Sequence, residues 1–211
     1  MNAPIRPAVR YAAIPALDPA VAKETGLFWW PLARLAEGLE ELARRSGLWR
    51  MPSLEPLTVP SSLAQVRSND IAEWLDWAAE RLGLEAEPVD AAMPDALTLL
   101  GGAGPAIVMH TDARGAGFFL LLRGRRGRLR MLRPDLRTGT CRAEALRALM
   151  CWSREAPLIP EIARLLTDAG VPERRRKAVT QAMLGERLSA ERIGGIWMLR
   201  LDRKSTRLNS S

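Results

Sequence analysis

Apolar side chains recur at helical spacing near the start of the chain. The segment "LFWWPLARLAEGLEELARRSGLW" carries leucines three or four residues apart, at Leu32, Leu35, Leu39 and Leu42. Pro31 suits the first turn of a helix, where a backbone N–H needs no partner, and Gly47 suits its C-terminal end. The spacing predicts one amphipathic helix here, after a proline-punctuated, extended lead-in at residues 1–26.

A second helical period follows a loop rich in proline and serine. In "SNDIAEWLDWAAERLGL" one apolar face consists of Ile71, Trp74, Leu75, Ala78 and Leu82. Ser68 or Asn69 is suited to cap the N-terminus, and Gly83 ends the pattern. The segment is therefore predicted to form a second amphipathic helix.

Shorter apolar runs bounded by glycine come next. "EAEPVDA" fits a short strand, and "MPDALTLLGGAG" fits a short helix that ends in glycines. Three further runs predict the strands of an antiparallel meander, at Ala106–His110, Phe118–Leu122 and Arg128–Leu132. "RGRRGR" is interpreted as the hairpin turn, in which Gly124 and Gly127 supply the unusual backbone angles. "PDLRTGT" is interpreted as another turn.

The rest of the chain is mostly helical. "CRAEALRALMCW" predicts one helix, and "APLIPEIARLLTDAGVPERRRKAVTQAMLGERL" predicts two helices broken at Gly170. "RIGGIWMLRL" then predicts a strand. The expected fold class is α+β, with helices packed on a small antiparallel sheet. We expect a domain at residues 27–152 and a helical connector with a terminal strand at residues 153–201.

The final segment, "DRKSTRLNSS" at residues 202–211, has no apolar periodicity. It looks like translated read-through of a sequencing adapter, so it is set aside from the fold. We expect the natural protein to continue past Leu201.

Composition adds a basic balance and little metal chemistry. Among 211 residues, 31 Lys and Arg against 24 Asp and Glu leave a net charge of +7. This balance favours phosphate-bearing partners or anionic membranes, although arginine-rich solvated faces give the same total. The N-terminus lacks the apolar core of an export signal, and no stretch reaches the ~18–20 apolar residues that span a bilayer. Cys141 and Cys151 form neither a disulfide framework nor a metal site, so reduced cytosolic thiols are expected.

The order of these elements resembles a papain-like core. It is most similar to the bacteriocin-processing cysteine peptidase domain at the N-terminus of many bacterial peptide-exporting ABC transporters. That family carries "DCG" at the start of its first long helix, a "lGL.a" helix end and a "lPaIah...nHFVVL...g.v.v.DPa.G" meander. The corresponding pieces here are "RLGLEAEPVDA" (Arg81–Ala91), "GPAIVMH" (Gly104–His110), "GFFLLLRGRRGRLRML" (Gly117–Leu132) and "RPDLRTG" (Arg133–Gly139). The resemblance covers roughly Leu27 to Trp152, and it rests on the order and spacing of the pieces.

The resemblance implies that the catalytic positions have been lost. A cysteine peptidase needs a thiolate, a histidine and a group that orients the histidine. The nucleophile position falls near Trp29, the histidine position at Gly117 and the aspartate position at Arg133. The expected activity is therefore that of a pseudo-peptidase, which is not an enzyme.

The same resemblance implies a larger parent protein. It would be an ATP-hydrolysing exporter that uses ATP and Mg²⁺ and dimerises through transmembrane and nucleotide-binding domains beyond Leu201. The present residues contain no "GxxxxGK[ST]" phosphate loop, so neither a cofactor nor a metal is expected in them. They would lie on the cytoplasmic side of the bacterial inner membrane and dock a cargo peptide or steady the transporter.

Two groups of side chains are candidate contact residues. Trp29 and Trp30 lie beside the lost nucleophile, where they would contact a peptide, plug the old cleft or belong to the core. A basic patch is expected at Arg125, Arg126, Arg128 and Arg130. It suits an anionic membrane surface, a nucleic-acid phosphate or an acidic leader peptide, but a solvated hairpin face is the simpler interpretation.

Two alternatives differ in class. The first is a soluble nucleic-acid-binding protein, because "VPERRRKAVTQAMLGERL" and the following strand resemble a winged-helix arrangement. However, "RRRK" places positive charge at a helix N-terminus, against the macrodipole. The second is an active enzyme that pairs His110 with Cys141 or Cys151, although a lone strand-end histidine is more often a packing residue.

Overall fold

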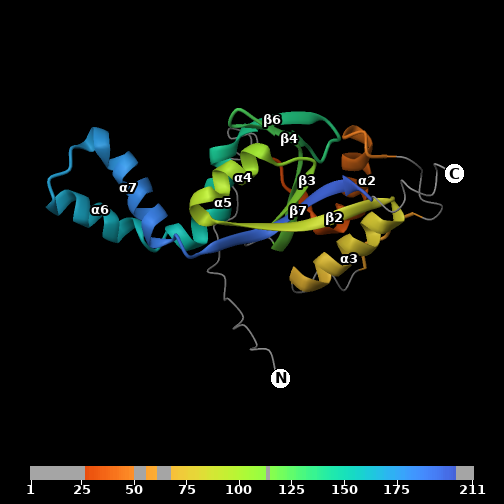
Figure 1. Cartoon of the computed structure of the whole chain (residues 1–211), viewed down its shortest axis with the longest axis horizontal. Helices are drawn as coiled ribbons and strands as arrows, with labels where there is room; N and C mark the ends of the chain where they lie inside the picture. Colours follow the sequence, from red (N-terminus) through yellow and green to blue (C-terminus); the bar gives the residue numbers. More distant parts are fainter. Residues whose placement is uncertain (1–26, 50–55, 61–67, 113–114, 203–211) are drawn as a thin grey trace, which may run out of the picture.

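The computed structural model describes residues 27–49, 56–60, 68–112 and 115–202 (Figure 1). The lead-in and all but the first residue of the tail lie outside these ranges, as do the side chains of the proposed caps Ser68 and Asn69. The described residues form an α+β fold with an antiparallel sheet, which confirms the predicted fold class at that level.

Within the described ranges, seven strands make one sheet, in the order β2–β7–β3–β4–β5–β6, with the two-residue β1 pairing to β4. Their bounds are β1 (Trp30–Pro31), β2 (Leu84–Ala92), β3 (Ala106–Asp112), β4 (Gly115–Arg125), β5 (Arg128–Leu132), β6 (Thr138–Arg142) and β7 (Arg192–Leu201). Every neighbouring pair is antiparallel. Because alternate side chains point to opposite faces, the sheet needs cover on both sides.

Helices supply that cover. The α-helices are α2 (Leu35–Arg45), α3 (Ser68–Arg81), α4 (Ala96–Gly102), α5 (Ala143–Glu155), α6 (Ile159–Asp168) and α7 (Glu173–Arg187). Two 3₁₀ turns precede α2 and α4, namely η1 (Leu32–Arg34) and η3 (Met93–Asp95). Figure 1 shows α6 and α7 as a hairpin that projects beyond the end of the sheet.

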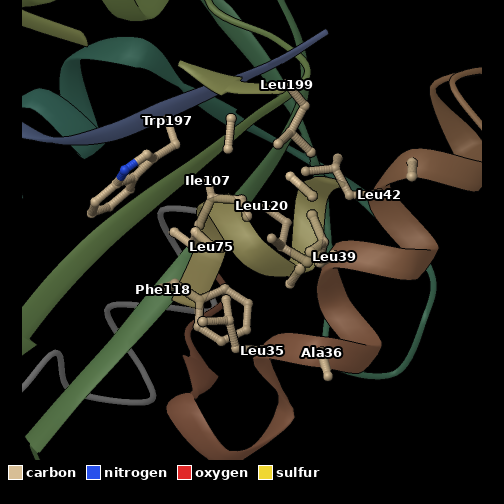
Figure 2. Packing of buried hydrophobic residues seen from close by; sticks show 14 of the residues in the cluster. Leu35, Ala36, Leu39, Leu42, Leu75, Ile107, Phe118, Leu120, Trp197 and Leu199 are labelled. Atoms are coloured by element: carbon tan, nitrogen blue, oxygen red, sulfur yellow. The ribbon is translucent and has the colours of Figure 1, made fainter. Parts of the chain in front are cut away.

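One face of the sheet packs against α2 and α3. Leu35 and Leu39 of α2 point toward Phe118 of β4, and all three are fully buried (Figure 2). The predicted leucine stripe is therefore the face that meets the sheet, and each buried leucine stabilises the fold by about 1.5–3 kcal/mol. The opposite face packs against α4 and α5 through Val108, Phe119 and their neighbours. The two cores therefore lie on opposite sides of the same strands.

The first helix begins later than the sequence predicts. Trp30 and Pro31 pair with Phe118 and Gly117 of β4, and the α-helix starts only at Leu35. The indole Nε1 of Trp30 donates to the backbone oxygen of Leu132 at 2.9 Å, which ties this segment to the sheet. Tertiary packing outweighs the local helical period here.

The hairpin turn also lies one step further on than expected. β4 continues through Gly124 to Arg125, and the turn residues are Arg126 (φ 49°) and Gly127 (φ 72°). Positive φ at both central residues is typical of a two-residue type I′ turn. A Cβ at Gly124 would lie 2.6 Å from the backbone oxygens of Leu100 and Gly101, so that glycine permits close packing of α4.

Two strands differ from the sequence-based interpretation. The segment interpreted as a turn and a helix start contains β6, which pairs with β5 at the sheet edge. β7 lies inside the sheet, between β2 and β3, with Trp197 opposite both Pro88 and Ile107. β7 was expected in the connector at residues 153–201, but it belongs to the same sheet as the strands of the expected domain at residues 27–152. β7 pairs with β2 and β3, so the described residues after α7 form no winged-helix hairpin.

Candidate functional site

The two tryptophans beside the lost nucleophile position have different surroundings. Trp30 is completely buried, and its ring stacks on Phe118 with centroids 5.8 Å apart. Arg34 covers the same indole at 4.8 Å from its centroid. Trp30 is therefore a core residue, and the possible peptide contact predicted for it would require the core to open.

Trp29 is only partly buried, and it packs against the backbone of Gly117. A Cβ built at Gly117 would overlap the Cε2, Cζ2 and Nε1 atoms of the Trp29 indole. The ring thus fills the volume that any side chain at position 117 would need. Trp29, near the position matched to the nucleophile, is therefore in direct contact with Gly117, the position matched to the histidine.

Arg133, matched to the aspartate position, lies against the chain neighbour of Trp29. Its Cζ is 4.1 Å from the ring centroid of Phe28, the residue before Trp29. Its guanidinium also forms an ion pair with Asp135, with Nη2 and Oδ2 3.1 Å apart. Asp135 in turn accepts a hydrogen bond from the backbone N–H of Arg137 at 3.1 Å.

We call Phe28, Trp29, Gly117 and Arg133 the Trp29 cluster. Trp29 contacts Gly117 of β4, and Phe28 contacts Arg133 at the end of β5, so two contacts link the three positions that the resemblance matched. None of the cluster's side chains is a nucleophile or a general base, and its one charged group is a cation. The cluster offers an apolar ring surface beside a partly exposed guanidinium.

His110 lies next to this cluster, which the sequence reasoning missed. It stands directly opposite Gly117 in the β3–β4 register, and it is 6% exposed. Its ring lies 6.1 Å from that of Phe119, between centroids. Counting along the chain puts His110 seven residues from Gly117, but an antiparallel hairpin folds that separation into a cross-strand pair. Direct pairing of the two apolar runs at Ala106–His110 and Phe118–Leu122 as one antiparallel hairpin would have predicted that His110 lies close to Gly117.

His110 and Cys141 are far apart in the sheet. They lie on β3 and β6, three strand spacings or roughly 14 Å across the sheet. Cys141 opposes Leu129, which opposes Gly124 of β4, whereas His110 opposes Gly117 of β4. Gly117 and Gly124 are seven residues apart, so His110 and Cys141 are also displaced by about 23 Å along the strands. This placement contradicts a His110–Cys141 pair.

Both thiols are buried and lie in surroundings that oppose ionisation. Burial raises the pKa of Cys141 to about 11. Burial also raises the pKa of Cys151 to about 11, with the charge of Arg147 lowering it in part. A thiol with such a pKa is almost entirely protonated at neutral pH, and the thiolate is the reactive form.

The predicted basic patch forms one face of three strands. Arg125 opposes Arg128, and Arg128 opposes Arg142, so the three side chains share a face. Arg130 opposes Arg123 on that same face. Arg126 lies in the turn at its edge. Sequence reasoning found the arginines of the turn and of β5, but it missed Arg123 and Arg142.

Among the described residues, no group of three or more His, Cys, Asp or Glu is placed to hold a metal ion. In the same part of the chain, none of the helices combines the length and apolar character needed to cross a bilayer. The chain matches no family model, and no curated protein matches it either.

Proposed function

We propose that this chain is a catalytically inactive, peptidase-like accessory domain of a bacterial ABC exporter. It lies on the cytoplasmic side of the membrane, where the Trp29 cluster docks a cargo peptide or the domain steadies the transporter. The observation that carries the proposal is the contact between Trp29 and Gly117. Trp29, near the position that the resemblance matches to a nucleophile, meets Gly117, the position matched to its histidine. The Trp29 indole fills the space that a side chain at position 117 would need.

The arrangement of the surrounding elements supports this assignment. A papain-like peptidase holds its nucleophile at the start of a long helix, opposite a strand that carries the histidine. Here the segment before α2 lies against β4, and Arg133 follows the neighbouring strand β5. A papain-like identity for the α+β fold belongs to this proposal.

The loss of catalysis has a simple chemical basis. Acyl transfer by a thiol requires a thiolate, a base within hydrogen-bond reach and an oriented imidazole. The Trp29 cluster supplies an indole, a glycine and a guanidinium. His110 is present at its border, but Cys141 is far from it and both cysteine thiols are buried and protonated.

Peptide docking would use the groups that remain. Phe28 and Trp29 are half-buried rings, which suit apolar side chains of an extended peptide at low entropic cost. Arg133 adds a cation that suits an acidic side chain nearby. Nucleotide and Mg²⁺ chemistry would belong to domains of the parent beyond Leu201, together with the homodimer contacts.

Peptide binding and cleavage by the whole chain test the proposal together. The probes are short fluorescent peptides that alternate apolar and acidic residues, and the variant is Trp29→Ala. Trp77→Ala is the matched control, because Trp77 is a 44% exposed tryptophan on α3. We expect no cleavage by any form, and a loss of binding of tenfold or more only for Trp29→Ala. Cleavage that iodoacetamide stops would contradict the inactive assignment, and equal binding by both variants would contradict docking at the Trp29 cluster.

A further inference from the structure

One face of the β4–β5–β6 meander carries five arginines on adjoining positions. We call them the arginine face: Arg123, Arg125, Arg128, Arg130 and Arg142. All five are exposed. On β5, Arg128 and Arg130 lie on the same face as Leu132, which is buried on the side of α2. The alternate residues Leu129 and Met131 point into the opposite core.

In the part of the chain that the structure describes, no acidic side chain forms an ion pair with any of the five guanidiniums of the arginine face. Many other arginines are paired, as Arg34 is with Glu37 and Arg192 with Asp90. Its members also oppose each other directly, in the pairs Arg123–Arg130, Arg125–Arg128 and Arg128–Arg142. Like charges at directly opposed positions destabilise a sheet. A general excess of arginine does not explain this arrangement, because it predicts mixed charges on the face.

We infer that the arginine face binds the surface of an anionic phospholipid bilayer. The strands set the spacing of the charges, at about 5 Å between neighbouring strands and about 7 Å between alternate residues. The result is a two-dimensional array of cations on one face of three paired strands. Such an array suits a flat polyanionic surface, to which each basic residue contributes independently.

The structure disfavours nucleic acid as the occupant. A two-stranded ribbon can enter the major groove, but this hairpin is three-stranded up to its turn. Arg142 pairs with Arg128, and the backbone N–H of Ala143 donates to the oxygen of Gly127 at 2.9 Å. Sheets that bind single strands stack bases on aromatic side chains, and the arginine face contains none.

Vesicle binding by the full 211-residue chain tests the inference. The probes are vesicles of phosphatidylcholine alone and of phosphatidylcholine with phosphatidylserine, together with single-stranded and duplex DNA. The test variant replaces four arginines with glutamine, at Arg123, Arg125, Arg128 and Arg130. The matched control removes the same charge from exposed positions on α6 and α7, at Arg164, Arg174, Arg175 and Lys177. A third variant replaces the same four arginines of the face with lysine.

The wild-type chain should bind only the anionic vesicles, and binding should weaken as salt increases. Each basic residue near such a surface contributes about a fivefold factor, so the glutamine variant, which loses four of them, should bind about 600-fold less tightly. The α6–α7 control and the lysine variant should stay within a few-fold of wild type. The glutamine variant should also melt no lower than wild type, because it removes like-charge repulsion.

Three results would overturn the inference. These are absence of binding to anionic vesicles, an equal loss in the α6–α7 control, and arginine-dependent binding to DNA that is tighter than binding to vesicles. The inference stands apart from the proposed function. Trp29→Ala should leave vesicle binding unchanged, and the glutamine variant of the face should leave peptide binding at the Trp29 cluster unchanged.

Discussion

The indole of Trp29 lies where a side chain at position 117 would have to be. In an active peptidase of the resembled family, the side chains at these two positions would be the reacting thiol and its base. Here the larger residue fills the space and the smaller one leaves room for it. Glycine at position 117 is therefore explained by packing against Trp29.

Gly117→Ala should destabilise the protein by about 1–3 kcal/mol, because the new Cβ overlaps the Trp29 ring in a packed site. Urea unfolding measures the change. In Gly117→Ala combined with Trp29→Ala, the cost of the alanine at 117 should largely disappear, which a double-mutant cycle reports as coupling. Gly101→Ala is the control, because no atom lies within 4 Å of the Cβ built there. Additive effects at positions 29 and 117 would contradict the contact.

Trp30→Ala should cost about 3–5 kcal/mol, as expected for removal of a fully buried aromatic side chain. It removes the stacking on Phe118 and leaves the Leu132 oxygen without its indole donor. Trp77→Ala should cost less, because that residue is 44% exposed. Denaturant unfolding of the two variants compares them directly. A small effect at Trp30 would mean that β1 does not anchor α2 to the sheet.

The two cysteines should react slowly in the folded protein. With pKa values raised to about 11 by burial, labelling by iodoacetamide at neutral pH should be far slower than in the urea-unfolded chain. The unfolded state releases these protons first as the pH rises above 9.0, so the free energy of unfolding should fall between pH 9.0 and about 11. Mass spectrometry of labelled peptides follows each thiol. Rapid labelling of either thiol in the folded chain at pH 7 would contradict its burial.

In the β4–β5 turn, one substitution should lower the free energy of unfolding and another should leave it unchanged or raise it. Gly127→Ala should destabilise by about 1 kcal/mol or more, because alanine is strained at a φ of 72°. Arg126→Asn should be neutral or stabilising, because asparagine tolerates a φ of 49° and a type I′ turn favours Asn-Gly. Thermal unfolding measures both changes. Destabilisation by Arg126→Asn would indicate that Arg126 makes a contact beyond the turn.

Local patterns predicted most of the elements but not their neighbours in space. Leucine spacing located α2, and alternation located β5, because both depend on one buried face. β6 was missed because "TGTCR" contains one apolar residue, Cys141, and its stability comes from pairing with β5. The central position of β7 depends on pairing with strands far away in the chain, which no local period encodes.

The candidate site was predictable only in part. The motif spacing suggested that positions 29, 117 and 133 belong together, and the structure places all three in the Trp29 cluster. The same reasoning treated Trp29 and Trp30 as equivalent, whereas pairing to β4 buries Trp30 completely. The position of His110 opposite Gly117 was not predicted, because it follows from the β3–β4 register.

The central claim is that this chain belongs to an exporter, and reading the source DNA across the codon for Leu201 and onward tests it most directly. The account predicts an open frame that encodes several apolar segments of about 20 residues and then a GxxxxGK[ST] phosphate loop. A stop codon within a few residues of Leu201 would contradict the exporter assignment.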